Sequence, residues 1–424
     1  MKIAICGLVN NDNLGEEFIS ASLQWLIEKN LRELGYEGEI RFEEVDITAR
    51  SEGPGDYKNK LEKRLKSLYE YKAAGLPLDV IDVSLKRLGR KTENIASRNR
   101  ISRFRHFIWQ HGMNYRKRYM SYLDYKLHDA DVIVIDGAGL LEYSWNEYQE
   151  LLLFISEYAE ENNKPIYINA VGRAGEFDLR DYRCKVLIDA FRSKAVRYVS
   201  ARDSLESVQA CVGAKQRVKL LADAAFWVDK TYGVEAKEDR DTVGIGLIRG
   251  NALQSYKKDF TEEDWIALFA DIAETLQKRG YKFQFFTNGE KLDQQLGYKV
   301  LEKLGLDNSY ITERPMDAKV LIDTISGYKG LITCRMHSSI CAFSMRIPSV
   351  ILSWNDKVDK YMAITGYPER AVAMEDFSGE FIVDAFEKAM EEGISEEALQ
   401  RMRDMAEESV KDYAKDMLEV TGNL

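Results

Sequence analysis

The sequence lacks the patterns that mark several large classes of protein. Its 424 residues include only 6 prolines, and no Gly/Ser-rich or Pro-rich tract interrupts the chain, so a long flexible linker is not expected. No apolar run reaches the ~18–20 residues that a membrane-spanning helix needs. The net charge of −10 does not favour a nucleic-acid-binding protein. These absences favour a globular chain, which at roughly 100–200 residues per domain should have two domains.

Cysteine is also scarce. The five cysteines are scattered, and no pair has CxxC spacing. An odd number of scattered cysteines in a large chain is typical of a reducing compartment and of buried thiols. The amino-terminal stretch 1–7 is strand-like and too short for the apolar core of a signal peptide. We therefore expect a cytoplasmic protein.

Several catalytic motifs are missing as well. The sequence contains no GxGxxG after its first strand, no GxxxxGK[ST], no HExxH and no GxSxG. Only four histidines are present, and His106, His111 and His128 lie in or at the end of one basic segment. A histidine-rich metal centre is therefore not expected, and we predict neither a metal nor a cofactor.

What the chain does have is a regular alternation of short β-branched runs with amphipathic helical stretches. This alternation predicts an α/β fold in which parallel sheets carry helices on both faces. The expected strands are Lys2–Gly7, Glu39–Asp46, Asp131–Asp136, Pro165–Val171, Val196–Ala201, Val218–Ala222, Thr242–Ile248, Tyr281–Thr287, Gly330–Cys334 and Ser349–Ser353. The expected helices include Glu16–Leu34, Asn146–Glu161, Asp203–Val212, Thr261–Arg279, Met316–Ser326, Ser338–Met345, Phe377–Glu392 and Ser395–Met417. Asp203 and Glu206 have capping-box spacing, and Thr261 is expected to cap its own helix.

The polar segment 231–241 lacks periodicity and is expected to be a linker. It would join an amino-terminal domain, 1–230, to a carboxyl-terminal domain, 242–394. The architecture suggests that the last helix, within 395–424, crosses back to the first domain.

Residues 50–128 break the alternation. They are helical in pattern, rich in aromatic residues and basic, and from residue 57 to 127 Lys and Arg outnumber Asp and Glu by about three to one. We expect a helical insertion in the first domain. Two interpretations stay open: a solvated basic face with its aromatic residues packed inward, or a surface that meets an anionic acceptor or membrane headgroups.

The strongest local signal is the segment Thr333–Ser339, TCRMHSS. It joins an apolar strand to a helical stretch, so Arg335 and His337 should lie at the carboxyl end of a strand and the amino end of a helix. Ligands bind there in α/β sheets, and the free N–H groups of a helix start favour an anion. A guanidinium adds affinity for carboxylate or phosphate, and an imidazole can donate a proton near neutral pH. The alternative is a structural Arg–His pair.

Four weaker segments have similar positions. Ser200–Ser204 contains Arg202 and Asp203 after a strand, where a surface ion pair is the alternative. Glycine turns occur at Asn13–Glu16 and Asp136–Gly139. Asp223 begins the DAAF segment after another strand, and Lys357 follows the strand 349–353, where it is either an anion contact or an ordinary surface lysine.

In chain order these segments resemble the polysaccharide pyruvyl transferase family. Asn13, Gly15 and Glu16 look like its NxGD turn, with Glu in place of Asp, and Gly137 and Gly139 look like its GGG turn, interrupted by Ala138. SARDS, DAAF and RMHSSI, followed by Pro348 and by Asp356-Lys357, resemble its later segments, with Trp354 at a position that is often Tyr. The resemblance covers nearly the whole chain except the basic insertion.

The resemblance implies a fold similar to GT-B glycosyltransferases, with two Rossmann-like domains facing across a cleft. It implies transfer of the pyruvyl group of phosphoenolpyruvate to two hydroxyls of a sugar in a cell-surface or exopolysaccharide precursor, giving a cyclic ketal. His337, Arg335 and Arg202 would be the catalytic residues, with His337 as the acid. Arg202, Arg335, Ser338, Ser339 and Lys357 would bind the donor, and Asp203 or Asp223 would accept a hydroxyl proton. The residues of the two glycine turns, Asn13, Gly15, Glu16, Gly137 and Gly139, would serve the acceptor or the turns themselves.

The partners expected on this basis are phosphoenolpyruvate and a glycan acceptor. The basic insertion suggests that the acceptor is lipid-linked and that the cytoplasmic protein makes peripheral contact with the inner membrane face. Two alternatives remain: a GT-B glycosyltransferase that uses a nucleotide sugar, for which Glu369 is an isolated ribose-binding carboxylate, and a non-catalytic relative.

Overall fold

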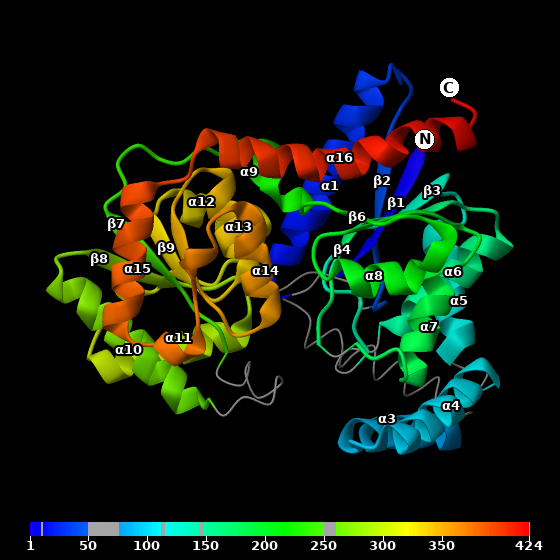
Figure 1. Cartoon of the computed structure of the whole chain (residues 1–424), viewed down its shortest axis with the longest axis horizontal. Coiled ribbons are helices and arrows are strands. Elements are labelled where there is room, and N and C mark those ends of the chain that lie inside the picture. The colour runs from blue at the N-terminus through cyan, green and yellow to red at the C-terminus, as the bar shows by residue number, and fades with distance from the viewer. Residues whose placement is uncertain are drawn as a thin grey trace. The chain divides into compact units, whose positions relative to one another are not determined.

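Two parallel β-sheets organise the chain in a computed structural model that describes residues 1–9, 12–49, 76–111, 115–143, 148–175, 177–249 and 260–423 (Figure 1). The first sheet has the order β2-β1-β3-β4-β5-β6 and the second β11-β10-β9-β7-β8, and every recorded strand pair is parallel. The strands are β1 (Lys2–Gly7), β2 (Arg41–Asp46), β3 (Val132–Ile135), β4 (Ile166–Val171), β5 (Val196–Ala201), β6 (Lys219–Leu220), β7 (Thr242–Gly246), β8 (Lys282–Phe286), β9 (Gly330–Thr333), β10 (Ser349–Leu352) and β11 (Ala371–Val372). The expected α/β alternation is confirmed, and the short edge strand β11 was not predicted.

Helices connect most of these strands. They are α1 (Gly15–Glu33), α3 (Leu76–Lys91), α4 (Ile95–His111), α5 (Tyr115–Leu127), α6 (Gln149–Glu161), α7 (Tyr182–Phe191), α8 (Leu205–Val212), α9 (Val228–Tyr232), α10 (Glu262–Lys278), α11 (Lys291–Leu304), α12 (Ala318–Ser326), α13 (Met336–Ser344), α14 (Asp356–Thr365), α15 (Gly379–Glu392) and α16 (Glu396–Val420). Short 3₁₀ turns complete the path: η1 (Gly213–Lys215), η2 (Ala224–Trp227), η4 (Asn308–Tyr310), η5 (Pro368–Arg370) and η6 (Met374–Asp376). Among the described residues, no helix combines the length and the apolar character needed to cross a bilayer.

Two compact units divide the chain. The first comprises Met1–Asn10, Leu26–Leu221 and Glu408–Leu424, and the second Asn11–Trp25 and Ala222–Glu407. The boundary therefore falls before the polar segment 231–241, because η2 and α9 pack on α13 of the second unit. The helices α1 and α16 each contribute one part to each unit.

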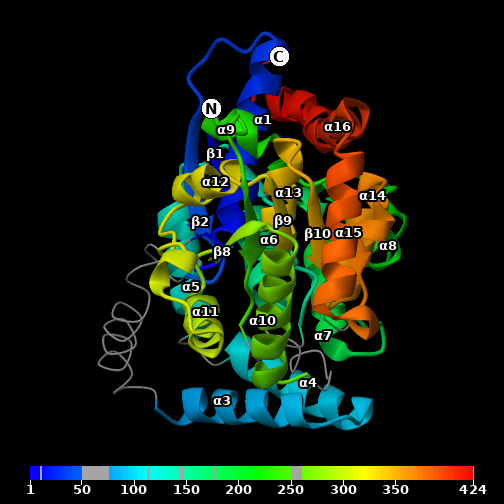
Figure 2. The same ribbon diagram turned by 90° about the vertical axis from the view of Figure 1, so that its left-hand side faces the viewer.

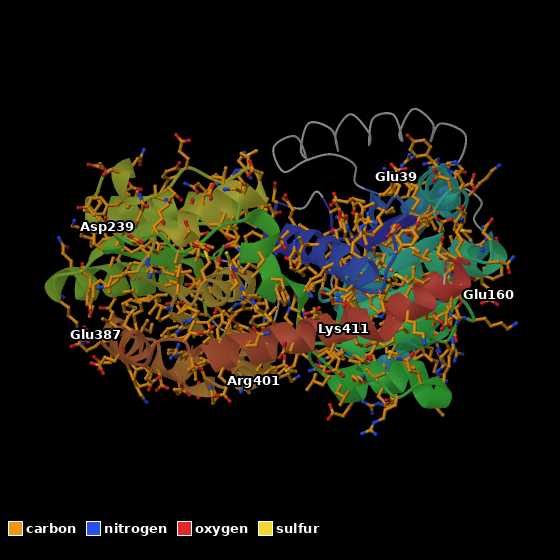
Figure 3. All side chains as sticks on the ribbon, turned by 90° about the horizontal axis from the view of Figure 1, so that it is seen from above. Glu39, Glu160, Asp239, Glu387, Arg401 and Lys411 are labelled. Carbon is orange, nitrogen blue, oxygen red and sulfur yellow. The ribbon has the colours of Figure 1, made fainter. Side chains whose placement is uncertain are left out.

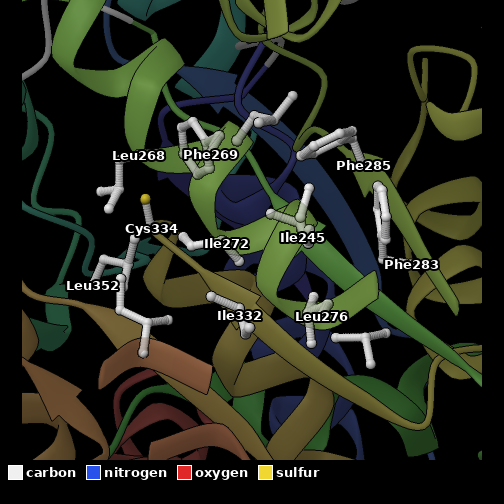
Figure 4. Close-up of a cluster of buried hydrophobic side chains, with 14 of the residues drawn as sticks. Ile245, Leu268, Phe269, Ile272, Leu276, Phe283, Phe285, Ile332, Cys334 and Leu352 are labelled. Atoms are coloured by element: carbon white, nitrogen blue, oxygen red, sulfur yellow. The ribbon is translucent and has the colours of Figure 1, made fainter. Parts of the chain in front are cut away.

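The core of the second unit shows why its sequence folds in layers. Alternate residues of β7, β8, β9 and β10, such as Ile245, Phe285 and Ile332, point to one face of the sheet. There they meet α10 and α15, which pack against each other (Figures 2 and 4). Thr261 caps α10 in a capping box with Asp264, as predicted. With α13 packed on β9 and β10, this rigid layer positions the carboxyl ends of the strands.

In the first unit, the described part of the helical insertion consists of α3, α4 and α5. The earlier part of the predicted insertion, residues 50–75, lies outside the described residues. The carboxyl-terminal part of α16 lies on β4 and β5, where Tyr413 stacks on Tyr167 at a ring distance of 5.2 Å. The five cysteines are buried and free, which confirms the prediction of buried thiols. Burial raises the pKa of the Cys6 and Cys184 thiols well above the usual range, so these two are not reactive thiolates.

Candidate active site

The carboxyl edge of the second sheet carries the residues best suited to chemistry. Thr287 and Asn288 follow β8, Arg335 follows β9 and Ser353 follows β10. In a parallel sheet these strand ends share one edge, which is where α/β proteins bind ligands. The predicted location of Arg335 and His337, between a strand and a helix, is confirmed: Arg335 is the N-cap of α13, and His337 is its second residue.

His337 is buried, with 5% of its surface exposed. Its Nε2 lies 3.7 Å from Oδ2 of Asp223, and among the described residues this nitrogen has no hydrogen-bond partner. Asp223 is fixed as the N-cap of η2, where its Oδ1 accepts the N–H of Ala225 at 3.0 Å. The imidazole thus keeps one nitrogen for a ligand, and a carboxylate stands near enough to compensate a positive charge on the ring.

The glycine turn that follows β1 in the sequence lies against the same histidine. A methyl group on Gly15 would lie 2.6 Å from both Cβ and Nδ1 of His337, so only glycine leaves room for the ring. The N–H of Leu14 donates to the carbonyl of Asn288 at 2.9 Å, and Nδ2 of Asn13 contacts Oε1 of Glu16 at 3.4 Å. Segments from opposite ends of the sequence therefore build one local cluster around His337.

Asn288 belongs to this cluster, although it was not among the site residues predicted from the sequence. Ser338 donates its hydroxyl hydrogen to Oδ1 of Asn288. The Nδ2 of Asn288 is buried and has no partner among the described residues, so it remains available as a donor. The signal that could have found it is the Asn-Gly pair directly after a strand. Gly289 has φ +99°, and a side chain there would meet the carbonyl oxygen of Asp12 at 2.5 Å.

Arg335 has a partner that the sequence did not reveal. Its Nε and Nη2 donate to Oδ2 of Asp293 at 3.1 and 2.5 Å, and Asp293 is fully buried near the start of α11. Burial acts to lower the pKa of Arg335, but the carboxylates of Asp293 and Glu290 outweigh it and the pKa is raised. The guanidinium is therefore charged and held in place, while part of its charge is already compensated. For its Nη1 no hydrogen bond to a described residue is recorded, which leaves that nitrogen for an anion.

The other predicted donor-binding residues of the second unit differ in their availability. The Ser338 and Ser339 side chains are fully buried, and the Ser339 hydroxyl bonds to Ser349 and Tyr361 at 2.8 and 3.1 Å. The backbone N–H of Ser339 donates to the carbonyl of Arg335 at 3.3 Å. A donor contact would therefore come from the backbone N–H of Ser338 in the first turn of α13, which Arg335 does not cap with its side chain. Lys357 lies in the first turn of α14 and is half-buried. Glu369 is exposed in η5.

In the first unit, Arg202 and Asp203 follow β5 and are both buried. Their side chains, 3.6 Å apart between Arg202 Nε and Asp203 Oδ2, pack over Gly172. Oδ1 of Asp203 accepts the N–H of Arg173 at 2.9 Å. The predicted capping box with Glu206 is therefore wrong: the N-cap of α8 is Ser204, at φ +47°, and no side chain caps it. The carboxylate instead ties the end of β5 to the loop after β4.

The turn after β3 shows how the chain accommodates the interrupted glycine triplet. Ala138 has φ +59°, a left-handed conformation that is uncommon for a residue with a side chain. Gly137 has φ +99°, and a side chain there would meet the carbonyl oxygen of Asn169 at 2.5 Å. The backbone of this turn therefore has the positive φ angles typical of glycine, although residue 138 is alanine. Gly139 is partly exposed.

The structure thus gathers the predicted site residues in two groups. The second unit contains Asn13, Gly15, Glu16, Asp223, Arg335, His337, Ser338, Ser339 and Lys357. The first unit contains Gly137, Gly139, Arg202 and Asp203. Direct packing or pairing is recorded within the second group between Gly15, His337 and Asp223.

Comparison with solved structures places this arrangement in the GT-B-like α/β class. UDP-GlcNAc 2-epimerase from Methanocaldococcus jannaschii is similar with a TM-score of 0.53 and 10% identity, over 98% of this chain and 100% of that one. The S. aureus MnaA structure with UDP has a TM-score of 0.51 and 9% identity, over 99% of this chain and 97% of that one. The Neisseria meningitidis UDP-GlcNAc 2-epimerase bound to UDP-GlcNAc has a TM-score of 0.50 and 11% identity, over 100% of both chains. At these identities the likeness shows the fold alone.

The family follows from the sequence profile. The profile of the polysaccharide pyruvyl transferase family matches residues 13–356, which include the Asn13 turn, the DAAF segment and His337. The chain therefore belongs to the polysaccharide pyruvyl transferase family, and the resemblance noted in its motifs is confirmed. No curated protein matches the chain.

Proposed function

We propose that the chain transfers the pyruvyl group of phosphoenolpyruvate to two hydroxyls of a sugar in a cell-surface or exopolysaccharide precursor, forming a cyclic ketal. Family membership supports transferase chemistry. The observation that carries the proposal is the buried imidazole of His337, whose Nε2 has no hydrogen-bond partner among the described residues and lies 3.7 Å from the Asp223 carboxylate.

The reaction needs an acid at one carbon of the donor. Protonated His337 gives its proton to the methylene carbon of phosphoenolpyruvate, which becomes a methyl group and leaves the central carbon electrophilic. One sugar hydroxyl adds to that carbon and loses its proton. The second hydroxyl displaces the phosphate, which leaves with the remaining proton. Atoms and charge balance without an oxidant or reductant, and a positioned acid typically contributes about 10²–10⁴-fold.

Asp223 is the better placed of the two candidate bases. Its Oδ2 lies near the imidazole, whereas Asp203 uses Oδ1 to hold the backbone of Arg173. In this scheme the proton of the first hydroxyl passes to the His337–Asp223 pair and restores the imidazolium. The Nη1 of Arg335 and the first-turn amides of α13 bind an acidic group of the donor.

The test is a comparison of histidine variants. We expect His337→Ala to fold and to lose at least ~10²-fold in kcat, measured as phosphate release from phosphoenolpyruvate with a panel of glycans. His128→Ala, which removes an exposed histidine of α5's carboxyl end, is the matched control and should keep full activity. In D₂O, the ketal methyl should carry one deuterium. Normal turnover by His337→Ala would contradict the mechanism.

Arg202 remains a residue that we predict to bind phosphoenolpyruvate. Arg202→Lys keeps a positive charge but loses the planar fork that binds carboxylate or phosphate. We expect the KM for phosphoenolpyruvate to rise at least ~10-fold, an effect of about 1.4 kcal/mol. Arg217→Lys in the same unit is the control. An unchanged KM in Arg202→Lys would remove Arg202 from the donor site without affecting the role of His337.

A further inference from the structure

The side-chain amide of Asn288 is a buried group that the proposed mechanism does not use. Asn288 follows β8, and only 1% of its surface is exposed. Its Nδ2 has no hydrogen-bond partner among the described residues. A buried donor is rarely left unsatisfied in a folded protein, because it loses its hydrogen bonds to water without a replacement. This nitrogen therefore marks a place where a ligand would supply the missing acceptor.

Two contacts fix the position and the orientation of this amide. The Ser338 hydroxyl donates to Oδ1 of Asn288, and the backbone carbonyl of Asn288 accepts the N–H of Leu14 at 2.9 Å. A side-chain amide carries its acceptor on one side and its two N–H donors on the other. A hydroxyl that holds Oδ1 therefore leaves the N–H groups of Nδ2 for another partner.

Further donors surround the amide, because its hydroxyl partner belongs to the first turn of α13, a helix of nine residues. Arg335 does not cap this helix with its side chain, and the first turn contains no acidic residue. For the backbone N–H of Ser338 no acceptor is recorded among the described residues, and Nε2 of His337 also lacks a partner there. Free N–H groups at a helix start attract an anion, and the Asn288 amide adds a donor to them.

The kind of donor favours a phosphate group over a carboxylate. A guanidinium matches a planar carboxylate through two parallel hydrogen bonds. The start of α13 and the Asn288 amide instead offer separate N–H groups, and such groups bind phosphate at helix N-termini. In the proposed reaction the phosphate also gains negative charge as it leaves, and preorganised neutral donors stabilise charge that develops in this way.

We propose that Nδ2 of Asn288 and the backbone N–H of Ser338 bind the phosphate group of the donor. The Ser338 side chain is then a positioning residue, because its hydroxyl orients the amide and does not itself contact the donor. The identity of the donor as phosphoenolpyruvate rests on the proposed function, whereas the phosphate site rests on the contacts of Asn288 with α13.

Substitution of Asn288 in the full-length chain tests the phosphate site. Asn288→Asp keeps the shape and an acceptor for Ser338 but replaces the donor by a charged oxygen, and Asn288→Ala removes the donor without adding charge. For both variants we expect the Kd for inorganic phosphate and the KM for phosphoenolpyruvate to rise at least ~10-fold, because a hydrogen bond to a charged group is lost. Titration calorimetry measures the Kd, and phosphate release measures the KM.

Two comparisons show whether the effect is specific for phosphate. The Kd for pyruvate, which has a carboxylate but no phosphate, should be the same in the Asn288 variants and in the unchanged chain. Asn308→Asp adds a carboxylate at an exposed asparagine of the same unit and should leave the phosphate Kd and the KM unchanged.

A double-mutant cycle tests the positioning role of Ser338. Ser338→Ala removes the hydroxyl but keeps the backbone N–H, and we expect it to raise the phosphate Kd about 2–10-fold, the effect of one neutral hydrogen bond. In the Asn288→Ala background the same substitution should have no further effect, because the hydroxyl acts through the amide. Ser344→Ala is the matched control, since Ser344 is buried in the same helix and its hydroxyl donates to the carbonyl of Cys341 at 2.8 Å. It should leave the phosphate Kd unchanged.

The proposal is overturned if the unchanged chain does not bind inorganic phosphate or if the Asn288 variants bind it equally well. Weaker binding of pyruvate with normal binding of phosphate would assign Asn288 to the carboxylate instead. Independent, additive effects of Ser338→Ala and Asn288→Ala would remove the positioning role. A failure of the proposed function looks different: the unchanged chain would bind phosphate through Asn288 but release none from phosphoenolpyruvate, and the phosphate site would stand.

Discussion

Gly15 and His337 occupy a space that holds only one side chain. Adding a methyl group at Gly15 must displace the imidazole, because the nearest ring and Cβ atoms would be 2.6 Å away. We expect Gly15→Ala to cost about 1–3 kcal/mol of stability and to lower kcat at least ~10-fold, since a displacement of about 1 Å can cost about 10²-fold in rate. Urea unfolding and phosphate release measure the two effects.

Gly327→Ala is the control for that substitution. Gly327 has an ordinary helical backbone, and the nearest atom to an added methyl group is 3.5 Å away. This variant should keep both stability and kcat. If Gly15→Ala kept the kcat of the unchanged chain, the turn at Asn13–Glu16 would not be part of the catalytic machinery.

Among the elements, α16 shows how a single helix is anchored by charge. Asp416 accepts hydrogen bonds from Arg197 Nε and Nη2 at 2.6 and 2.5 Å and from the Tyr167 hydroxyl at 2.7 Å. Earlier along the same helix, Arg403 donates to Asp229 at 2.6 Å within the second unit. Figure 3 labels Arg401 and Lys411 on α16, and the change from one unit to the other falls between these two residues.

Because of the Asp416 ion pair, the stability of the folded protein should depend on pH. Its hydrogen bonds with Arg197 lower the pKa of Asp416 below its ordinary value. A lowered folded-state pKa means that the stabilisation is complete above the unfolded-state pKa of about 3.9 and is lost as the pH falls through the folded-state value. We therefore expect Asp416→Asn to be less stable by about 1–2 kcal/mol at pH 7 and by much less near pH 3, as measured by urea unfolding.

The exposed Asp404 of the same helix supplies the control. Asp404→Asn should change stability by less than about 0.5 kcal/mol at either pH. A constant difference between Asp416→Asn and the unchanged chain from pH 7 to pH 3 would show that the Arg197 pair does not stabilise α16 through charge.

Helices and strands with a strong hydrophobic periodicity were predictable from the sequence. Elements that form only because of tertiary packing were not. The strand β1 and the capped helix α10 follow directly from β-branched runs and from Thr261. The two-residue strand β11 has too few residues for a period and exists because it pairs with β10. The predicted start of α13 fell two residues late, at Ser338 instead of Met336.

The candidate site was likewise predictable only where a local sequence pattern marks its residues. A strand followed by an Arg and a His points to the sheet edge, so Arg335 and His337 could be found from local pattern. Asp293 could not, because a carboxylate within a helix looks like an ordinary polar residue until packing places it under a guanidinium. The position of Gly15 against His337 is likewise a long-range contact that spacing along the chain does not encode.

For the whole molecule, ligand-induced stabilisation distinguishes the proposed donor from a nucleotide sugar. A ligand at about 100 times its dissociation constant adds about 2.7 kcal/mol to the free energy of unfolding. We expect phosphoenolpyruvate to raise the melting temperature saturably and UDP to leave it unchanged. Stabilisation by UDP alone would favour a glycosyltransferase, and no stabilisation by either would favour a non-catalytic member of the family.

The division of the chain into units has a consequence for biosynthesis. Residues 11–25 belong to the second unit, and the ring of Phe18 packs against Tyr232, a residue that is made much later than Phe18. The first sheet, in turn, receives its covering from Tyr413 only when the last helix emerges. Neither unit can be completed in order of synthesis, so apolar surface of the first unit stays open until α16 has been made. Fragments that end between the two units should therefore aggregate, and only the continuous polypeptide should yield folded protein.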